Sequence, residues 1–217
     1  MTAPLLVLHA WGDPLASTRW AALAGVWDGP FVAFDLPGHR GASIPTGGTY
    51  AQADAALYGD RALRAAGFGG VPAVIVGDSS AGYGAELLAA AGRAAALVLV
   101  DGLGDAWRSA DEVVTDGIRW CTAVAGDPAA LAPPPPDADV DPRLAHLFPS
   151  VWERSFTDAR RRSIAVPVVA IETPASPTPR EQRDDRLKSF SGPAVCVEVA
   201  DRTAEAVIAS GALNFPF

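Results

Sequence analysis

Six short apolar runs, most of them followed by a stretch suited to a helix, constrain the fold of this chain more than any other feature. The runs are residues 5–8, 31–34, 73–76, 96–100, 166–171 and 194–199. The central runs are apolar without alternation, which is typical of parallel strands covered on both faces. The expected helices are residues 15–25, 50–66, 80–92, 180–190 and 203–210. This order predicts one α/β domain over residues 1–217, with a mostly parallel sheet and right-handed crossovers.

The interval 102–165 breaks this rhythm, because it contains no convincing strand and is far longer than an ordinary connection. We expect helices near 109–125 and 151–164, and an extended segment at the four prolines 133–136. Several aromatic residues fall here: Trp107, Trp120, Phe148, Trp152 and Phe156. One interpretation of the interval is a helical insertion with its own small core. Another is a lid over an apolar substrate pocket, and both can hold at once.

The third run leads directly into Gly77-Asp78-Ser79-Ser80-Ala81-Gly82. Small residues surround Ser79, as a tight turn between a strand and a helix requires if a serine hydroxyl is to stand above the sheet. Here the sequence resembles the α/β-hydrolase superfamily, with Ala81 where the commonest motif has glycine. The resemblance implies that Ser79 is the nucleophile.

Two further segments resemble the same superfamily, and the resemblance covers essentially the whole chain. Residues 8–13, Leu-His-Ala-Trp-Gly-Asp, are similar to the family's oxyanion loop, and residues 34–43 are similar to its Asp-Leu-Pro-Gly-His-Gly-X-Ser turn. By this resemblance the oxyanion donors are the backbone N–H groups of Trp11 and Ser80. It also implies a three-layer fold with a helical lid at 102–165 and without the family's usual antiparallel N-terminal strands.

The sequence departs from the family where the acid and the base are expected. Ser176 stands at the position of the usual aspartate, and residues 199–203 lack the usual Gly-His pair. Serine needs a neighbouring base to become a good nucleophile at neutral pH. The triad is therefore degenerate at these two positions.

Other residues are candidates for the missing roles. Asp101, at the end of the fourth run, is a candidate acid, and Asp105 is a second one; a turn or capping role for Asp101 is the alternative. Among the histidines, we expect His9 to be structural and His39 to stabilise its turn. His146 belongs to the expected lid and is the candidate base, with a surface position as the alternative.

Three classes of function follow from these observations. The first is a serine hydrolase acting on an ester, thioester or lactone of a small apolar metabolite. The second is a non-hydrolytic enzyme of the cyclase or lyase type, in which Asp78, Asp101 or the substrate carries the proton. The third is a catalytically inactive binding protein.

Composition narrows the partners. The formal net charge of −8 argues against nucleic acid and anionic membrane surfaces. The two cysteines, Cys121 and Cys196, form neither a metal signature nor a disulfide framework. We therefore expect a small-molecule substrate and no metal or cofactor.

Residues 1–9 lack a basic segment typical of a secretory signal, and no apolar run approaches the roughly 18 residues that span a bilayer. A cytoplasmic protein is expected, and the two edges of the sheet make a homodimer plausible.

Overall fold

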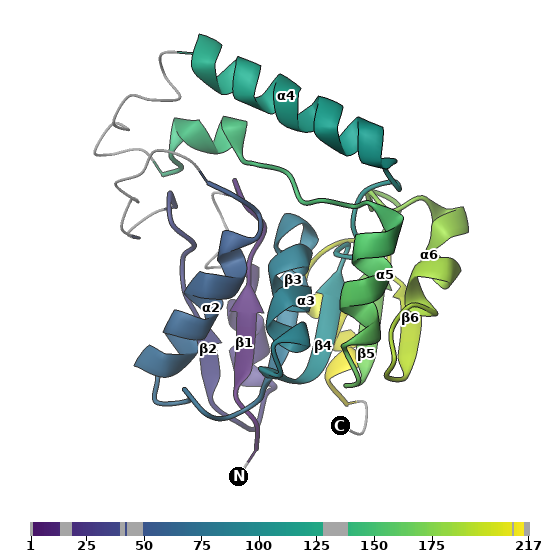
Figure 1. Ribbon diagram of the computed structural model, residues 1–217. Helices are drawn as coiled ribbons and strands as arrows, with labels where there is room; N and C mark the ends of the chain where they lie inside the picture. Colours follow the sequence, from purple (N-terminus) through teal and green to yellow (C-terminus); the bar gives the residue numbers. More distant parts are fainter. Residues whose placement is uncertain are drawn as a thin grey trace.

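The predicted parallel sheet is present in the computed structural model, which describes residues 2–13, 19–39, 42, 50–127, 139–209 and 211–214. The strands are β1 (Leu5–Leu8), β2 (Phe31–Ala33), β3 (Ala73–Asp78), β4 (Ala94–Val100), β5 (Val168–Glu172) and β6 (Ala194–Glu198). Their spatial order is β2-β1-β3-β4-β5-β6, and every pairing is parallel (Figure 1). The chain moves outward in one direction from β1 and then in the other from β3. Ligands of open α/β sheets bind beyond the carboxyl ends of the strands at such a switch point.

Alternate residues of each strand build two cores. On one face, residues such as Leu6, Ile75 and Leu97 pack with Leu63 and Leu88 from the helices. The opposite core is built from the alternate strand residues together with Trp20, Leu23 and Val207. Strands buried on both faces have no polar face, which explains the continuous apolar runs in the sequence.

Helices cover both faces and give the three layers that the resemblance implied. They are α2 (Asp54–Ala65), α3 (Gly82–Ala90), α4 (Ala110–Gly126), α5 (Arg154–Arg162), α6 (Arg180–Leu187) and α7 (Ala204–Ala209). The 3₁₀ helices are η1 (Ala21–Gly25), η2 (Ser79–Ala81), η4 (Pro142–His146) and η5 (Ala212–Asn214). Of the helix expected over 15–25, residues 14–18 lie outside the described residues, residue 19 is α-helical and residues 21–25 form the 3₁₀ helix η1. The four prolines 133–136 also lie outside them.

The interval 102–165 divides into two parts. α4 and η4 lie beyond the carboxyl ends of the strands, whereas α5 stands beside α3 on one face of the sheet (Figure 1). No residue of α4 is buried, although its first turn carries a complete capping box between Ser109 and Glu112. The second expected helix of the interval therefore belongs to the layer that covers the sheet.

Buried ion pairs explain the position of α5. The Arg161 guanidinium lies 2.6 Å from the carboxylate of Glu86 in α3, and both side chains are fully buried. Arg160 contacts the other oxygen of the same carboxylate at 2.6 Å. Burial alone would raise the pKa of Glu86, but the two guanidinium groups hold it below its ordinary value. Arg161 also donates to the carbonyl oxygen of Leu103, at the start of the interval.

Candidate active site

Ser79 occupies a strained turn between β3 and α3. Its φ is +49°, a left-handed conformation that costs a non-glycine residue roughly 1–3 kcal/mol. The turn also needs glycines, since a Cβ on Gly77 would lie 2.6 Å from Ala85 Cβ, and one on Gly82 would lie 2.7 Å from Gly102 Cα. No residue that the structure describes is hydrogen-bonded to Ser79 Oγ. The backbone therefore has the conformation expected of a nucleophile elbow, with the hydroxyl uncommitted.

The two expected oxyanion donors meet beside this turn. The Trp11 N–H donates to Ser80 Oγ at 3.0 Å, which joins the loop after β1 to the helix after β3. Ser80 is the second residue of η2, and the first N–H groups of a helix have no intrahelical acceptor. An oxyanion at this position would compete with the Ser80 hydroxyl for the Trp11 N–H.

His9 and His39 hold the loop after β1, the expected oxyanion loop, in place. His9 accepts from the Leu36 N–H at Nε2, 2.8 Å away, and its Nδ1 is 2.9 Å from the Ala10 carbonyl oxygen. His39 accepts from the Gly12 N–H at Nε2, also at 2.8 Å, and its Nδ1 contacts the Leu36 carbonyl oxygen. Burial lowers the pKa of His9 to about 4 and lowers the pKa of His39 as well. Both rings are therefore neutral and fully hydrogen-bonded at neutral pH, in keeping with the structural roles expected for them.

His146 lies in the layer beyond the carboxyl ends of the strands, at the end of η4. Its Nε2 is 2.6 Å from Oδ2 of Asp127, the residue directly after α4. The Trp120 indole N–H donates to the His146 carbonyl oxygen at 2.7 Å. The sequence did not single out Asp127, because a carboxylate 19 positions away carries no pattern. His146 forms an acid–imidazole pair here, and it is not hydrogen-bonded to Ser79.

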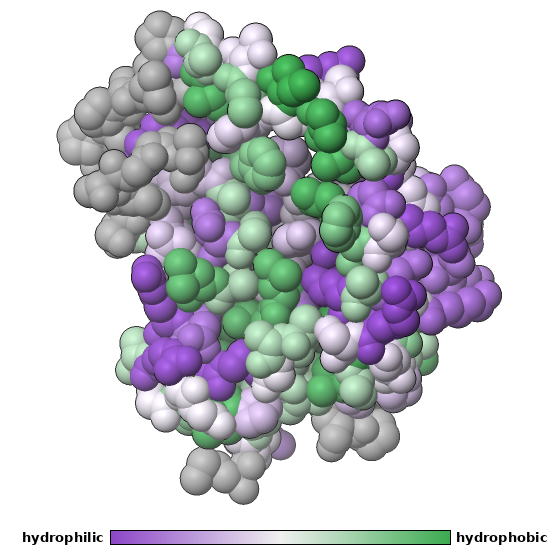
Figure 2. Space-filling model, viewed as in Figure 1, coloured by the Kyte–Doolittle hydropathy of each residue, from purple (hydrophilic) through white to green (hydrophobic). Residues whose placement is uncertain are grey.

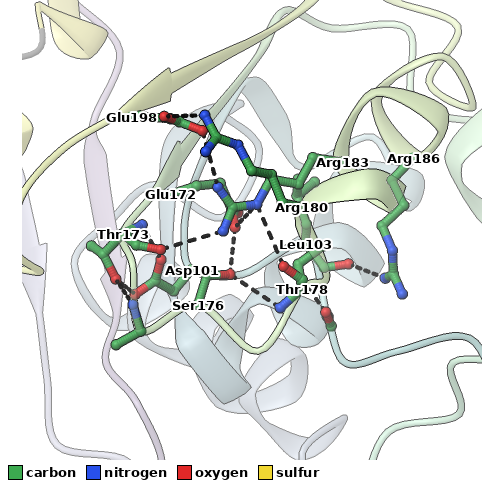
Figure 3. Close-up of polar contacts among 12 residues, drawn as sticks. Asp101, Leu103, Glu172, Thr173, Ser176, Thr178, Arg180, Arg183, Arg186 and Glu198 are labelled. Atoms are coloured by element: carbon green, nitrogen blue, oxygen red, sulfur yellow. Dashed lines mark hydrogen bonds and ion pairs between the residues drawn. The ribbon is translucent and has the colours of Figure 1, made fainter.

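Asp101 is buried and holds the loop that follows β5. Its two carboxylate oxygens accept from the N–H and the hydroxyl of Thr173, both at 2.7 Å (Figure 3). Its φ is also +49°. The described residues give Asp101 no histidine partner, so its observed contacts match the turn role stated as the alternative; its assignment as catalytic acid stays a prediction.

Glu172, the last residue of β5, is the centre of a second polar cluster (Figure 3). Its carboxylate accepts from the Ser176 hydroxyl and lies 3.4 Å from the Arg183 guanidinium, which is also 3.4 Å from Glu198. Burial raises the pKa of Glu172 to about 7. The cluster borders a cavity of about 400 Å³. Ser176, at the usual acid position, therefore serves as a hydrogen-bond donor to a buried carboxylate.

Arg202 stands in the segment where the family's histidine is expected. From the loop after β6 its Nε reaches to 3.3 Å from Oδ1 of Asp78, which is fully buried at the end of β3. The other oxygen of Asp78 accepts from the Ala10 N–H at 3.3 Å. Burial raises the pKa of Asp78 to about 6, although Arg202 opposes the shift. Arg202 also borders a cavity of about 510 Å³ together with Asp101 and Thr173.

This arrangement can polarise a carbonyl group and offer a serine hydroxyl to it. Among the described residues there is no group of three or more His, Cys, Asp or Glu side chains able to bind a metal ion, and no helix long and apolar enough to cross a membrane. The residues brought together are Trp11, Ser79 and Ser80. His146 and Asp101 have other partners.

No protein-family model matches the chain, and no curated protein matches it either. Similar solved structures include the thioesterase domain from the curacin biosynthetic pathway, with 18% identity, 97% of this chain and 89% of that chain covered, and a TM-score of 0.70. A thermophilic esterase from Thermogutta terrifontis has 19% identity over 99% and 89% of the two chains, with a TM-score of 0.68. An N-acyl homoserine lactonase has 17% identity over 98% and 88%, with a TM-score of 0.60. These neighbours share one fold, and the sheet order, the Ser79 turn and the oxyanion loop agree with it: the chain adopts the α/β-hydrolase fold.

Proposed function

We propose that this protein is a serine hydrolase that cleaves an ester, thioester or lactone of a small apolar metabolite, with Ser79 as the nucleophile. The observation that carries the proposal is the left-handed Ser79 turn, in which the Trp11 N–H binds the adjacent Ser80 and no described residue is hydrogen-bonded to Ser79 Oγ. A fold that maintains backbone strain at one serine is consistent with a functional role for that serine. The thioesterase, esterase and lactonase activities named for the structural neighbours support the same bond types.

In this mechanism Ser79 Oγ attacks the carbonyl carbon, and the oxyanion forms against the N–H groups of Trp11 and Ser80. The tetrahedral intermediate then collapses: its C–O or C–S bond to the leaving group breaks, and the alcohol or thiol departs with the proton that the base took from Ser79. Water attacks the acyl-enzyme, the carboxylic acid is released and Ser79 regains its proton. The proton of Ser79 requires a base within hydrogen-bond reach, about 2.6–3.2 Å. His146 is the proposed base, since Asp127 already occupies its Nε2 and Nδ1 remains for Ser79. This step requires α4 and η4 to act as a lid that closes over the turn.

The test is covalent labelling with a fluorophosphonate probe, followed by peptide mapping. Stoichiometric labelling of Ser79, lost in Ser79→Ala, supports the nucleophile. Labelling that slows at least tenfold in His146→Gln, with a smaller effect in Asp127→Asn, supports the proposed base. Arg180→Gln is the control, because it changes an exposed side chain outside the proposed machinery. His39→Gln is not suitable, since it disturbs the oxyanion loop. Absence of labelling in a folded protein would reject the hydrolase.

A second candidate function rests on Arg202. An arginine replaces the base in the segment where the fold places it, and it is paired with Asp78 rather than with Ser79. This favours a non-hydrolytic role. In that role the oxyanion loop binds a carbonyl group, and the Asp78 carboxyl, whose pKa is raised, exchanges a proton with the ligand. Turnover that survives Ser79→Ala but not Asp78→Asn would favour this candidate over the hydrolase.

A further inference from the structure

Strand β6 is an unprotected edge of the sheet. It pairs with β5 alone and lies at the end of the strand order (Figure 1). Natural edge strands are usually short or carry lysine, proline or a bulge, which blocks pairing with another chain. Residues 194–198, Ala-Val-Cys-Val-Glu, contain no lysine or proline, and Glu198 at the carboxyl end is the one charged residue; Val195 is 39% exposed. The opposite edge, β2, is only three residues long.

The hydrogen bonds to β5 determine which backbone groups of β6 face outward. The Val168 N–H donates to the Pro193 carbonyl oxygen, and the Val199 N–H donates to the Glu172 carbonyl oxygen. Since the direction of these groups alternates along a strand, the odd-numbered residues bond to β5. The N–H and C=O groups of Ala194, Cys196 and Glu198 therefore point to the free edge.

The helix beside this edge carries a self-complementary pair of charges. A groove of about 570 Å³ runs along β6, with apolar lining from Leu187, Phe190 and Val195. Asp184 of α6 and Lys188, the residue directly after α6, are both exposed and border the same groove. Neither forms an ion pair with any residue that the structure describes. A two-fold axis at this edge would bring Asp184 of each copy toward Lys188 of the other.

We propose that β6 is the interface of a homodimer in which two copies pair antiparallel and form a continuous sheet. The axis passes next to Cys196, the central residue of the strand, so that Ala194 faces Glu198 of the second copy and Cys196 faces its own counterpart. This register pairs all five residues and keeps the two Glu198 carboxylates apart. Because α6 of both copies lies on the same face, the charges of Asp184 and Lys188 pair across the axis. The matching charges favour a second copy over an unrelated strand.

The first test is the mass in solution by sedimentation velocity. We expect a species of twice the 22.4 kDa chain mass. Added salt should raise the fraction of monomer, because salt screens the charge pairs across the axis. Cys196→Pro removes an outward N–H and leaves the bonds to β5 intact, so it should yield a monomer. Ala33→Lys on the β2 edge is the matched control and should remain dimeric. A monomeric wild-type protein, or a dimer that survives Cys196→Pro in a protein with unchanged circular dichroism, overturns the proposal.

The second test does not depend on the proline variant. Lys188→Asp should weaken the dimer at least tenfold, and Asp184→Lys combined with Lys188→Asp should restore it. In a Cys121→Ser background, copper–phenanthroline and oxygen should join Cys196 to Cys196, because hydrogen-bonded antiparallel pairs place their Cα atoms ~5.5 Å apart, within disulfide range. Lys188 is the only lysine, so after carbodiimide treatment the peptide map of the covalent dimer should contain an amide between Lys188 of one copy and Asp184 of the other. Failure of both the charge exchange and the Cys196 bridge would reject this register.

Discussion

The Nε of Arg202 lies 3.3 Å from the buried Oδ1 of Asp78, so the loop after β6 is tied to the residue that precedes Ser79. The α/β-hydrolase fold commonly places its catalytic base in this loop. Here the loop returns across the carboxyl ends of the strands as that fold requires, but it brings a guanidinium to a carboxylate. The loop after β6 therefore reaches the turn at Ser79, but it brings an arginine there instead of a histidine.

Asp78→Asn should therefore change how stability depends on pH. Because burial raises the pKa of Asp78 to about 6, the native state binds this proton more tightly than the unfolded chain. Stability from this group is complete below pH ~4, the unfolded pKa, and is lost as pH rises through about 6. The variant lacks that loss, so it should gain roughly 1–3 kcal/mol relative to the wild type between pH 4 and pH 8. Urea unfolding at both pH values measures the difference in unfolding free energy between the variant and the wild type. The same difference at pH 4 and pH 8 would contradict the prediction.

Arg202→Gln provides the matched comparison. Removing the guanidinium should raise the pKa of Asp78 further, and this variant should lose stability at pH 8 while matching the wild type at pH 4. The double variant Asp78→Asn with Arg202→Gln should recover at pH 8. An equal loss at both pH values would show that Arg202 acts through packing rather than through its charge.

The sequence was sufficient to predict the sheet. Short uninterrupted apolar runs such as 73–76 and 96–100 are typical of parallel strands that helices cover on both faces. The sequence was also sufficient to predict the tight turn at Ser79, since tight turns restrict residue types. The roles of Ser79 and of the loop after β1 stay predictions. The ion pairs that position the site were not predicted. Arg202 meets Asp78, and Asp127 meets His146, across long separations that leave no spacing pattern in one sequence. The sequence also gives no sign that Arg161, one of three consecutive arginines, is fully buried.

Ser176→Ala should destabilise the protein only where Glu172 is ionised. The Ser176 hydroxyl donates to the Glu172 carboxylate and opposes the rise of its pKa, which burial takes to about 7. We expect a loss of roughly 0.5–1.5 kcal/mol at pH 8.5 and a smaller one at pH 5, where Glu172 is protonated. Ser189→Ala is the control, because that hydroxyl donates to a backbone carbonyl and its loss should not depend on pH. The same difference between the two pH values in both variants would contradict the role of Glu172.

Glu86→Gln should be among the most damaging single changes in the chain. It leaves the guanidinium groups of Arg160 and Arg161 buried without an anionic partner, and removing one side of a buried pair typically costs about 3–5 kcal/mol. Asp185→Asn is the control: it removes an exposed pair with Arg154 and should cost less than about 1 kcal/mol. Denaturant midpoints measure both, and similar values for the two variants would show that the α5 pairs add little.

Ser80→Ala tests the oxyanion site in the proposed hydrolase. The Ser80 hydroxyl accepts from the Trp11 N–H at 3.0 Å, so a substrate carbonyl must displace it before both N–H groups can bind the oxyanion. A net hydrogen bond is worth roughly 0.5–1.5 kcal/mol, and its removal should raise the rate of fluorophosphonate labelling at Ser79 about 2- to 10-fold. Ser80→Thr keeps the hydroxyl and should label at the wild-type rate or below. Slower labelling in Ser80→Ala would mean that the hydroxyl helps to bind the oxyanion, and the competition inferred from the Trp11 contact would then be wrong.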